Sequence, residues 1–68
     1  MNSYIIVYGM RNVFVGYIEK IDYKTNTFTT TKDKRKAKNY KGHDNKLADD
    51  LVTLRHMGTN FAFDFTTM

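Results

Sequence analysis

The first part of the chain alternates in the manner of β-strands and is broken by turn residues at two places. Residues 3–31 are rich in Tyr, Ile, Val, Phe and Thr, which favour extended strands. The breaks fall at residues 9–12 and 24–26, where Asn12 and Asn26 tolerate the positive φ of a tight hairpin turn. We therefore predict three antiparallel strands, over about residues 3–9, 13–22 and 26–31.

Two helices are predicted next. Residues 33–40 suit a short helix that is capped by Thr31 or Asp33 and interrupted by Gly42. A longer helix begins at the cap residue Asp44, because an apolar stripe at positions i, i+4 and i+7 follows it. Its last turn holds basic side chains, which suit a helix C-terminus. The stripe is Leu47, Leu51 and Leu54, the basic residues are Arg55 and His56, and Gly58 is the stop.

Three phenylalanines near the C-terminus predict a closing strand. They alternate with other residues, so that the rings of Phe61, Phe63 and Phe65 lie on one side. With 68 residues and no cysteine, the chain has room for one core and forms no disulfide. We expect one small α+β domain over residues 1–68, an antiparallel sheet packed on one main helix in the order β-β-β-α-α-β.

The sequence lacks the marks of a membrane helix or a secretory signal. The longest apolar run, residues 4–8, is far shorter than the ~20 residues that span a bilayer. Residues 1–8 have neither a charged start nor a cleavage site. We therefore expect a cytoplasmic protein without membrane contacts.

The positive charge is concentrated in one segment. Residues 32–46 hold seven of the eleven basic residues and two acidic ones, whereas the rest of the chain has four basic and five acidic residues. Such a segment attracts polyanions or an acidic protein surface, unless it only keeps a small protein soluble.

The first hairpin has a predicted register in which Arg11 and Asn12 are the two central turn residues. The expected pairs are Met10 with Val13, Tyr8 with Val15, Ile6 with Tyr17 and Tyr4 with Glu19. The face that suits the helix then holds Ile5, Val7, Phe14, Gly16 and Ile18, and the other holds Tyr4, Ile6, Tyr8, Val13, Val15 and Tyr17. Because Lys20 would otherwise fall on the core face, we also expect a β-bulge near residues 19–21.

The tyrosine-bearing face is a candidate binding surface, since one main helix covers one side of the sheet. Tyrosine has an apolar ring and a polar hydroxyl, so it suits a surface that is both wet and adhesive. Its candidate residues are Tyr4, Tyr8 and Tyr17. An apolar patch of this kind indicates a partner or a homodimer, through this face or a sheet edge, unless residues 33–40 or the chain ends fold over it.

Catalytic and cofactor chemistry is not indicated. Ser3 has no recognisable base, and His43 and His56 have no third ligand at a metal-binding spacing. The adjacent carboxylates Asp49 and Asp50 point about 100° apart on a helix and form no joint acid–base site. The four glycines match no phosphate-binding loop. We expect a non-enzymatic protein without cofactor or metal.

Two binding functions remain, and both use the same residues. A partner protein with an acidic surface would meet the tyrosine face and the lysines. Alternatively, a nucleic acid would place its phosphates on the lysines and stack its bases on the tyrosines. The shared basic residues are Lys34, Arg35, Lys36, Lys38 and Lys41. Three strands followed by a helix also resemble the AP2-like DNA-binding domains of some phage-type integrases.

The segment from Phe28 to Tyr40, FTTTKDKRKAKNY, is followed by an amphipathic helix and a closing strand. This pattern resembles small uncharacterised phage and prophage proteins of Gram-positive bacteria, of which the staphylococcal-type group DUF2483 is one example. Phe28, Ala37 and Tyr40 match that family's pattern as core contacts. The resemblance implies no catalytic activity. It implies a phage accessory protein that binds and modulates one host protein, such as a defence nuclease or a replication or transcription component.

Overall fold

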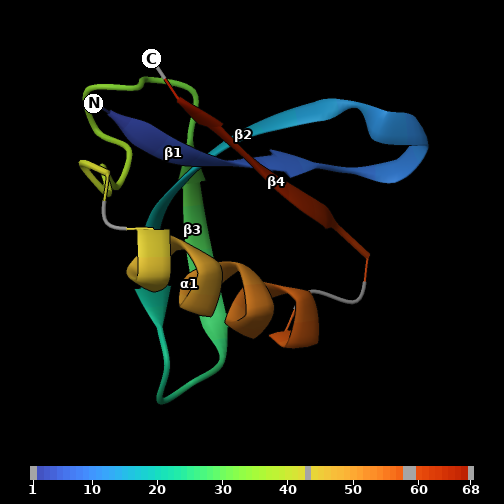
Figure 1. Cartoon of the computed structure of the whole chain (residues 1–68). Coiled ribbons are helices and arrows are strands. Elements are labelled where there is room, and N and C mark those ends of the chain that lie inside the picture. Colours follow the sequence, from blue (N-terminus) through green and yellow to red (C-terminus); the bar gives the residue numbers. More distant parts are fainter. Residues whose placement is uncertain (1, 43, 58–59, 68) are drawn as a thin grey trace.

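The computed structural model describes residues 2–42, 44–57 and 60–67. Its elements are β1 (Ser3–Tyr8), a 3-10 turn (Met10–Asn12), β2 (Phe14–Asp22), β3 (Thr27–Thr31), α1 (Asp44–Met57) and β4 (Ala62–Thr67). The strands form one antiparallel sheet in the order β3-β2-β1-β4, and α1 lies against one side of it (Figure 1). The α+β class is confirmed, but the described residues contain one α-helix, so the order β-β-β-α-α-β is wrong.

Both hairpin turns lie where the sequence predicts them. Arg11 and Asn12 have φ values of 60° and 59°, and the Val13 N–H donates to the Met10 carbonyl at 3.3 Å. Two consecutive residues with positive φ match the twist of the flanking strands, as in a type I′ turn. Asn26, with a φ of 56°, has the predicted positive φ in the second hairpin.

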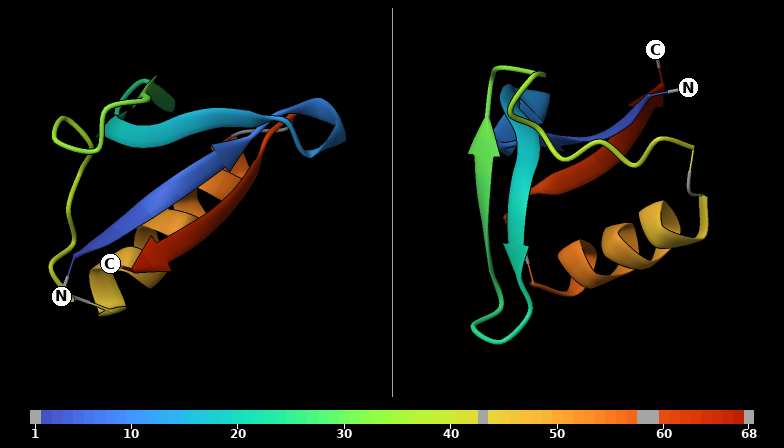
Figure 2. Two further views of the ribbon diagram at one scale, coloured as in Figure 1. Left: turned by 90° about the horizontal axis from the view of Figure 1, so that it is seen from above. Right: turned by 90° about the vertical axis from the view of Figure 1, so that its left-hand side faces the viewer.

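Residues 33–40 do not form the predicted helix, because main-chain N–H groups of this segment hydrogen-bond to two neighbouring strands instead. Strands β1 and β2 diverge away from their turn, and residues 38–40 lie between them (Figure 2). The N–H groups of Lys38 and Tyr40 donate to carbonyls of β2 and β1, both at 2.9 Å. Helix-like bonding is confined to a turn, in which Lys36 bonds to Asp33 at 3.0 Å and Ala37 to Lys34 at 3.2 Å.

Helix α1 lies in the angle between two strand pairs, β1 with β4 and β2 with β3, and its leucine stripe is buried there (Figure 2). The leucines pack with side chains from both pairs and with the ring of Tyr40, which is 3% exposed. The core is Ile5, Val7, Ile18, Tyr40, Leu47, Leu51, Leu54 and Phe63. The predicted stripe, the aliphatic members Ile5, Val7 and Ile18, and Tyr40 as a core contact are therefore confirmed.

The three phenylalanines of the closing strand are not equally buried. Phe63 is 5% exposed, whereas Phe65 is 51% and Phe61 is 42% exposed. Phe61 precedes β4 and packs edge to face on Phe28, with 5.8 Å between ring centroids. Because β4 is an edge strand and one helix covers the sheet, only the central ring is enclosed. The predicted partnership of all three rings with the leucines is correct for Phe63 alone.

The bulge predicted near residues 19–21 is present. The register between β2 and β3 shifts between Ile18 and Lys20, so Lys20 is exposed and Ile21 packs against the core. The insertion restores the apolar alternation that an unbroken strand would have lost.

A second bulge, which the sequence analysis missed, lies in the first hairpin. The pair Ile6 and Tyr17 forms as predicted, but Tyr8 then lies opposite Phe14 instead of Val15. The extra residue reverses the faces of the sheet on which Phe14 and Val15 lie. Val15 therefore packs against the core, and Phe14 is 41% exposed. The predicted placement of Phe14 on the core face and of Val15 on the tyrosine face is therefore wrong.

Strand β3 approaches β2 closely at Gly16. A Cβ added at this glycine would lie 2.9 Å from the Thr31 carbonyl oxygen, which belongs to the backbone and has little freedom to move. We expect Gly16→Ala to lower the free energy of unfolding by about 2 kcal/mol in urea denaturation. Gly9→Ala is the control, because its Cβ would meet the Val15 side chain at 3.3 Å. Equal losses in the two variants would contradict this interpretation.

Some predicted features lie outside the described residues. These are His43, the helix stop Gly58 and the side chain of the predicted cap Asp44. The basic last turn of α1, with Arg55 and His56, is present.

Candidate binding surface

Four aromatic rings form a continuous row on the side of the sheet opposite the helix. Phe14 lies between two of the tyrosines, 6.4 Å from the ring of Tyr8 and 5.4 Å from that of Tyr17, in edge-to-face contacts. Tyr17 in turn lies 6.0 Å from Tyr4. We call Tyr4, Tyr8, Phe14 and Tyr17 the aromatic row. The three predicted tyrosines are therefore brought together, and the bulge adds Phe14 to them.

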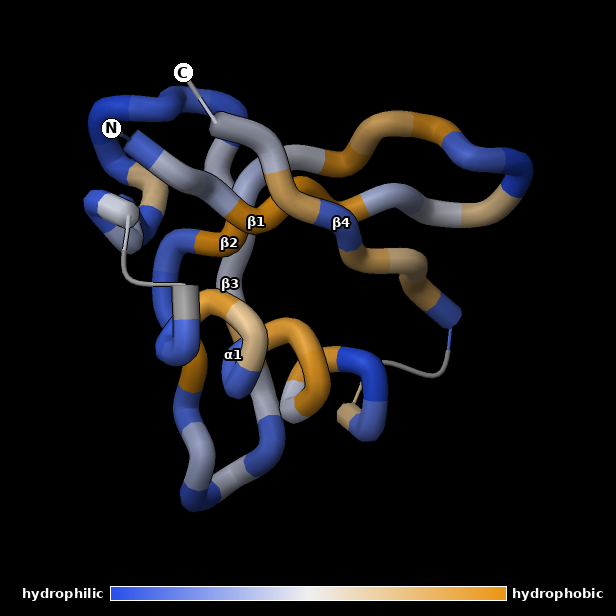
Figure 3. The backbone as a smooth tube through the Cα atoms, viewed as in Figure 1, coloured by the Kyte–Doolittle hydropathy of each residue, from blue (hydrophilic) through white to orange (hydrophobic). Residues whose placement is uncertain are grey.

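The aromatic row is covered at one end and open at the other. Tyr4 is buried, at 8% exposed, and Tyr8 and Tyr17 are half-buried. Exposure rises toward the first hairpin turn, from Phe14 to Val13 (61%) and Met10 (79%). Figure 3 shows this apolar stretch at the start of β2 beside the hydrophilic turn. The face is neither fully enclosed nor fully free.

The basic segment meets the aromatic row at Lys34. The Lys34 Nζ lies 5.5 Å from the centroid of the Tyr17 ring, within the range of a cation–π contact. Arg35 is exposed and pairs with Asp33 at 3.2 Å, and Lys36 is exposed next to it. We call Lys34, Arg35 and Lys36 the basic cluster. Lys32 and Lys41 are also exposed, but no ring contact joins them to the row.

Lys38, another predicted binding residue, serves a different purpose on the helix side. Its Nζ lies 3.2 Å from Oδ2 of Asp50 in α1, a residue that is 1% exposed. The hydroxyls of Tyr23 and Tyr40 donate to the same carboxylate at 2.6 and 2.5 Å, and the Lys46 Nζ lies 3.7 Å away. This Asp50 cluster ties α1 to the second hairpin and to residues 38–40.

The hydrogen bonds of the Asp50 cluster fix its protonation. Burial alone would raise the pKa of Asp50, but the donors Tyr23, Tyr40 and Lys38 together hold its pKa below the ordinary 3.8. Burial raises the pKa of Tyr40, and the hydrogen bond to Asp50 raises it further. At neutral pH the cluster therefore contains an ionised carboxylate and protonated tyrosines. A buried charge that is satisfied in this way holds structural elements together.

Acid should weaken the fold through Asp50. Because its pKa is lower in the folded than in the unfolded chain, its stabilising effect is present above the unfolded value and disappears as the pH falls through the folded one. We expect the free energy of unfolding to drop below about pH 4. The hydrogen bonds of Arg35 also lower the pKa of Asp33, so the measurement uses Asp33→Asn as the background. Unchanged stability down to pH 2 in that variant would contradict the assignment.

Sequence reasoning overlooked Asp50, although a signal was present. Asp50 follows Leu47 by three residues and precedes Leu54 by four, so it lies on the buried stripe of the helix. A carboxylate in such a position needs donors. The donors Tyr23 and Lys38 come from distant parts of the chain, and no local pattern identifies them.

The described residues show no group of three or more metal-ligating side chains, and no helix among them is long and apolar enough to cross a membrane. In the comparisons with known proteins, no protein-family model, no curated protein and no solved structure matches the chain. The resemblance to small phage proteins therefore stays a prediction.

Proposed function

We propose that the chain is a non-enzymatic binding module that captures an acidic surface of a partner protein and modulates that protein. The observation that carries this proposal is the Lys34 contact with the Tyr17 ring, at 5.5 Å from the centroid. This contact joins the basic cluster to the aromatic row through Lys34. Aromatic and basic side chains in one patch suit a protein interface, with apolar contacts at its centre and charges around it.

A protein partner is favoured over a nucleic acid, because the ring faces of the aromatic row are partly covered. Stacking of unpaired bases needs open ring faces. Here the rings of the row meet tilted or edge to face, Tyr4 is buried, and the face of Tyr17 carries the Lys34 ammonium. The most exposed apolar groups are Met10 and Val13, which offer contacts to apolar side chains and no stacking surface.

Nucleic-acid binding is the second candidate, because Lys32, Lys36 and Lys41 are exposed and suit phosphates. Within the first proposal, the resemblance to phage accessory proteins makes the partner a host protein, such as a defence nuclease or a replication or transcription component. The place of action is then the cytoplasm of the host cell.

Phe14→Ser tests the apolar part of the surface. Phe14 is 41% exposed and lies between Tyr8 and Tyr17, so its loss should cost little stability but weaken partner capture by about tenfold or more. The measurement is affinity capture from a bacterial host lysate treated with nuclease. Val52→Ser is the matched control, an apolar residue of α1 that is 55% exposed.

Three outcomes separate the candidates. Capture that survives nuclease, depends on Phe14 and tolerates the Val52 change supports the proposal. Capture that disappears with nuclease, together with polynucleotide affinity that declines steeply with salt, supports the nucleic-acid alternative. Equal capture by both variants would show that the aromatic row is not the binding surface.

A further inference from the structure

The two edges of the sheet differ in how their main-chain groups are used. On β4, Arg55 Nη2 donates to the Phe63 carbonyl at 3.2 Å, and the Phe65 N–H donates to Asp64 Oδ1 at 2.8 Å. Such contacts hinder another strand from pairing with that edge. On β3, no side chain of the described residues hydrogen-bonds to the main chain of Thr27–Thr31. Among the described residues, the β3 edge is therefore the one that is left open to pairing.

Exposed lysines accompany β3 along its length. Lys24 precedes the strand, Lys20 pairs with Thr29 near its middle, and Lys32 follows its last residue. Between Lys20 and Lys32 the sequence has one carboxylate, Asp22, which accepts hydrogen bonds from the N–H groups of Lys24 and Thr25 in the turn, at 3.0 and 3.3 Å. The edge therefore has an excess of positive charge, which favours an acidic strand.

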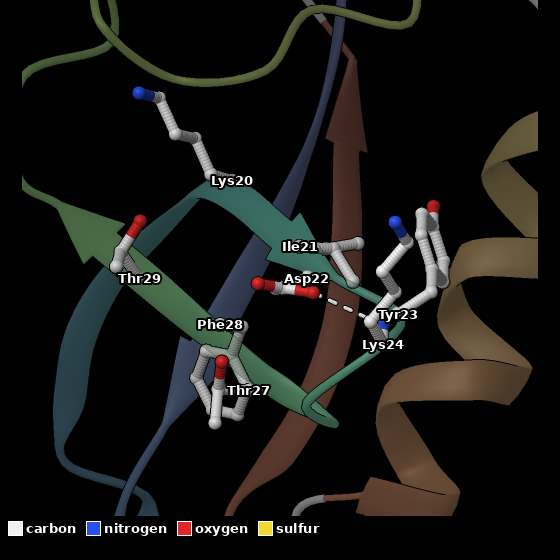
Figure 4. Close-up of a pocket in the computed structure, with 8 residues that line it drawn as sticks. All are labelled: Lys20, Ile21, Asp22, Tyr23, Lys24, Thr27, Phe28 and Thr29. Carbon is white, nitrogen blue, oxygen red and sulfur yellow. Dashed lines mark hydrogen bonds between the residues drawn. The ribbon is translucent and has the colours of Figure 1, made fainter.

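Hollows lie beside the same strand. A groove of about 420 Å³ on the helix side is lined by Val15, Phe28, Thr30 and Phe61, among others. A second hollow, of about 590 Å³, follows the second hairpin from Lys20 to Thr29 (Figure 4). Figure 4 shows Ile21 directed toward the helix and Lys20 directed away from it. A strand placed beside β3 would thus meet apolar side chains on the helix side, while the opposite side of the sheet carries Lys20 on the next strand, β2.

We propose that an extended acidic segment of the partner protein adds to the four-stranded sheet as a further strand along β3. Its apolar side chains enter the groove beside Phe28, and the alternating Asp or Glu side chains reach Lys20, Lys24 and Lys32. A second copy of this chain is disfavoured as the occupant, because pairing β3 with itself brings like charges together. The inference rests on the proposed function in one respect, that the partner is a protein.

A peptide provides the test, because it supplies the segment without the rest of the partner. The probe is a short synthetic peptide that alternates glutamate with valine and phenylalanine. We expect it to slow amide hydrogen exchange in Thr27–Thr31 and not in β4. N-methylation of the peptide at alternate residues on the pairing side removes its main-chain donors and should weaken binding about 30-fold, as expected for two lost hydrogen bonds.

Lys20→Ser tests the charge, with Arg11→Asn as the matched control at an exposed basic residue of the first hairpin turn, where asparagine tolerates the positive φ. The first should weaken peptide binding about threefold at low salt, and the second should leave it unchanged. Equal binding of the N-methylated peptide, protection on β4, or self-association that protects β3 without peptide would each overturn the inference.

The peptide test and the capture experiment can fail separately. If Phe14-dependent capture persists but the peptide does not bind, this inference is overturned and the proposed function stands. If the peptide binds β3 but no protein is captured through Phe14, the proposed use of the aromatic row is overturned instead.

Discussion

Replacing Asp50 with alanine should lower the free energy of unfolding by about 3 kcal/mol, which is a large part of the stability of a domain of this size. The carboxylate is 1% exposed and accepts hydrogen bonds from Tyr23, Tyr40 and Lys38. Its removal leaves the buried Tyr40 hydroxyl without its acceptor. It also releases the contact between α1 and residues 38–40. Urea denaturation followed by circular dichroism measures the loss.

Asp49→Ala is the matched control, since Asp49 is the neighbouring carboxylate on the same helix and is exposed. Its replacement should change the free energy of unfolding by no more than about 0.5 kcal/mol. A loss as large as that in Asp50→Ala would mean that helix propensity or net charge determines the effect. The Asp50 cluster would then not be the structural tie described above.

Leu54→Ala should lower the free energy of unfolding by a similar amount, about 3 kcal/mol. Leu54 is fully buried in the core that α1 shares with both strand pairs. Truncation removes apolar contacts and leaves a cavity that the small sheet has little freedom to fill. The midpoint of urea denaturation should fall while the slope stays unchanged.

Val52→Ala is the control for the core prediction. Val52 belongs to the same helix and is 55% exposed, so its truncation leaves no buried cavity. The free energy of unfolding should change by about 0.5 kcal/mol or less. If Leu54→Ala proved as mild as Val52→Ala, α1 would not pack on the sheet through its leucine stripe.

The strands and turns could be predicted because their signals are local. Asn12 and Asn26 mark the two hairpins, and both have the positive φ expected of them. The leucine spacing fixed the buried side of α1 in the same way. The position of Lys20 in an apolar alternation was sufficient to predict the bulge in β2.

The features that were mispredicted depend on distant parts of the chain. Residues 33–40 have helical composition, but main-chain acceptors in β1 and β2 hold residues 38–40 between the strands. Phe14 lies outside the core face because the first hairpin contains a bulge. No residue type near this bulge indicates it. Local propensity is a weak guide where tertiary hydrogen bonds compete with it.

Most residues of the candidate surface could be predicted from the sequence, but not how they lie relative to one another. Its tyrosines and lysines were named from composition and alternation, and the tyrosines do form one row. The sequence pattern predicted the same binding role for Lys34 and Lys38. The structure separates them, because Lys34 lies over Tyr17 on one side of the sheet and Lys38 reaches Asp50 on the other. Side-chain direction in an irregular segment depends on the strands that hold it.

We infer that the basic segment has two roles, one in stability and one in binding. Lys38 and Tyr40 anchor it to the helix through Asp50. On the other side of the sheet Lys34 lies over Tyr17, and Arg35 and Lys36 follow it as exposed residues. Replacing the basic cluster should therefore leave stability nearly unchanged, whereas Lys38→Ser should lower it by about 1 kcal/mol or more.

The most direct test is affinity capture from a nuclease-treated host lysate by the triple variant Lys34→Ser, Arg35→Ser, Lys36→Ser. Its urea midpoint is measured on the same preparation. We expect a midpoint close to that of the unchanged protein and a loss of most of the captured partner, with the remainder insensitive to added salt. A variant that unfolds, or one that is folded and captures the partner as well as the unchanged protein does, would contradict it.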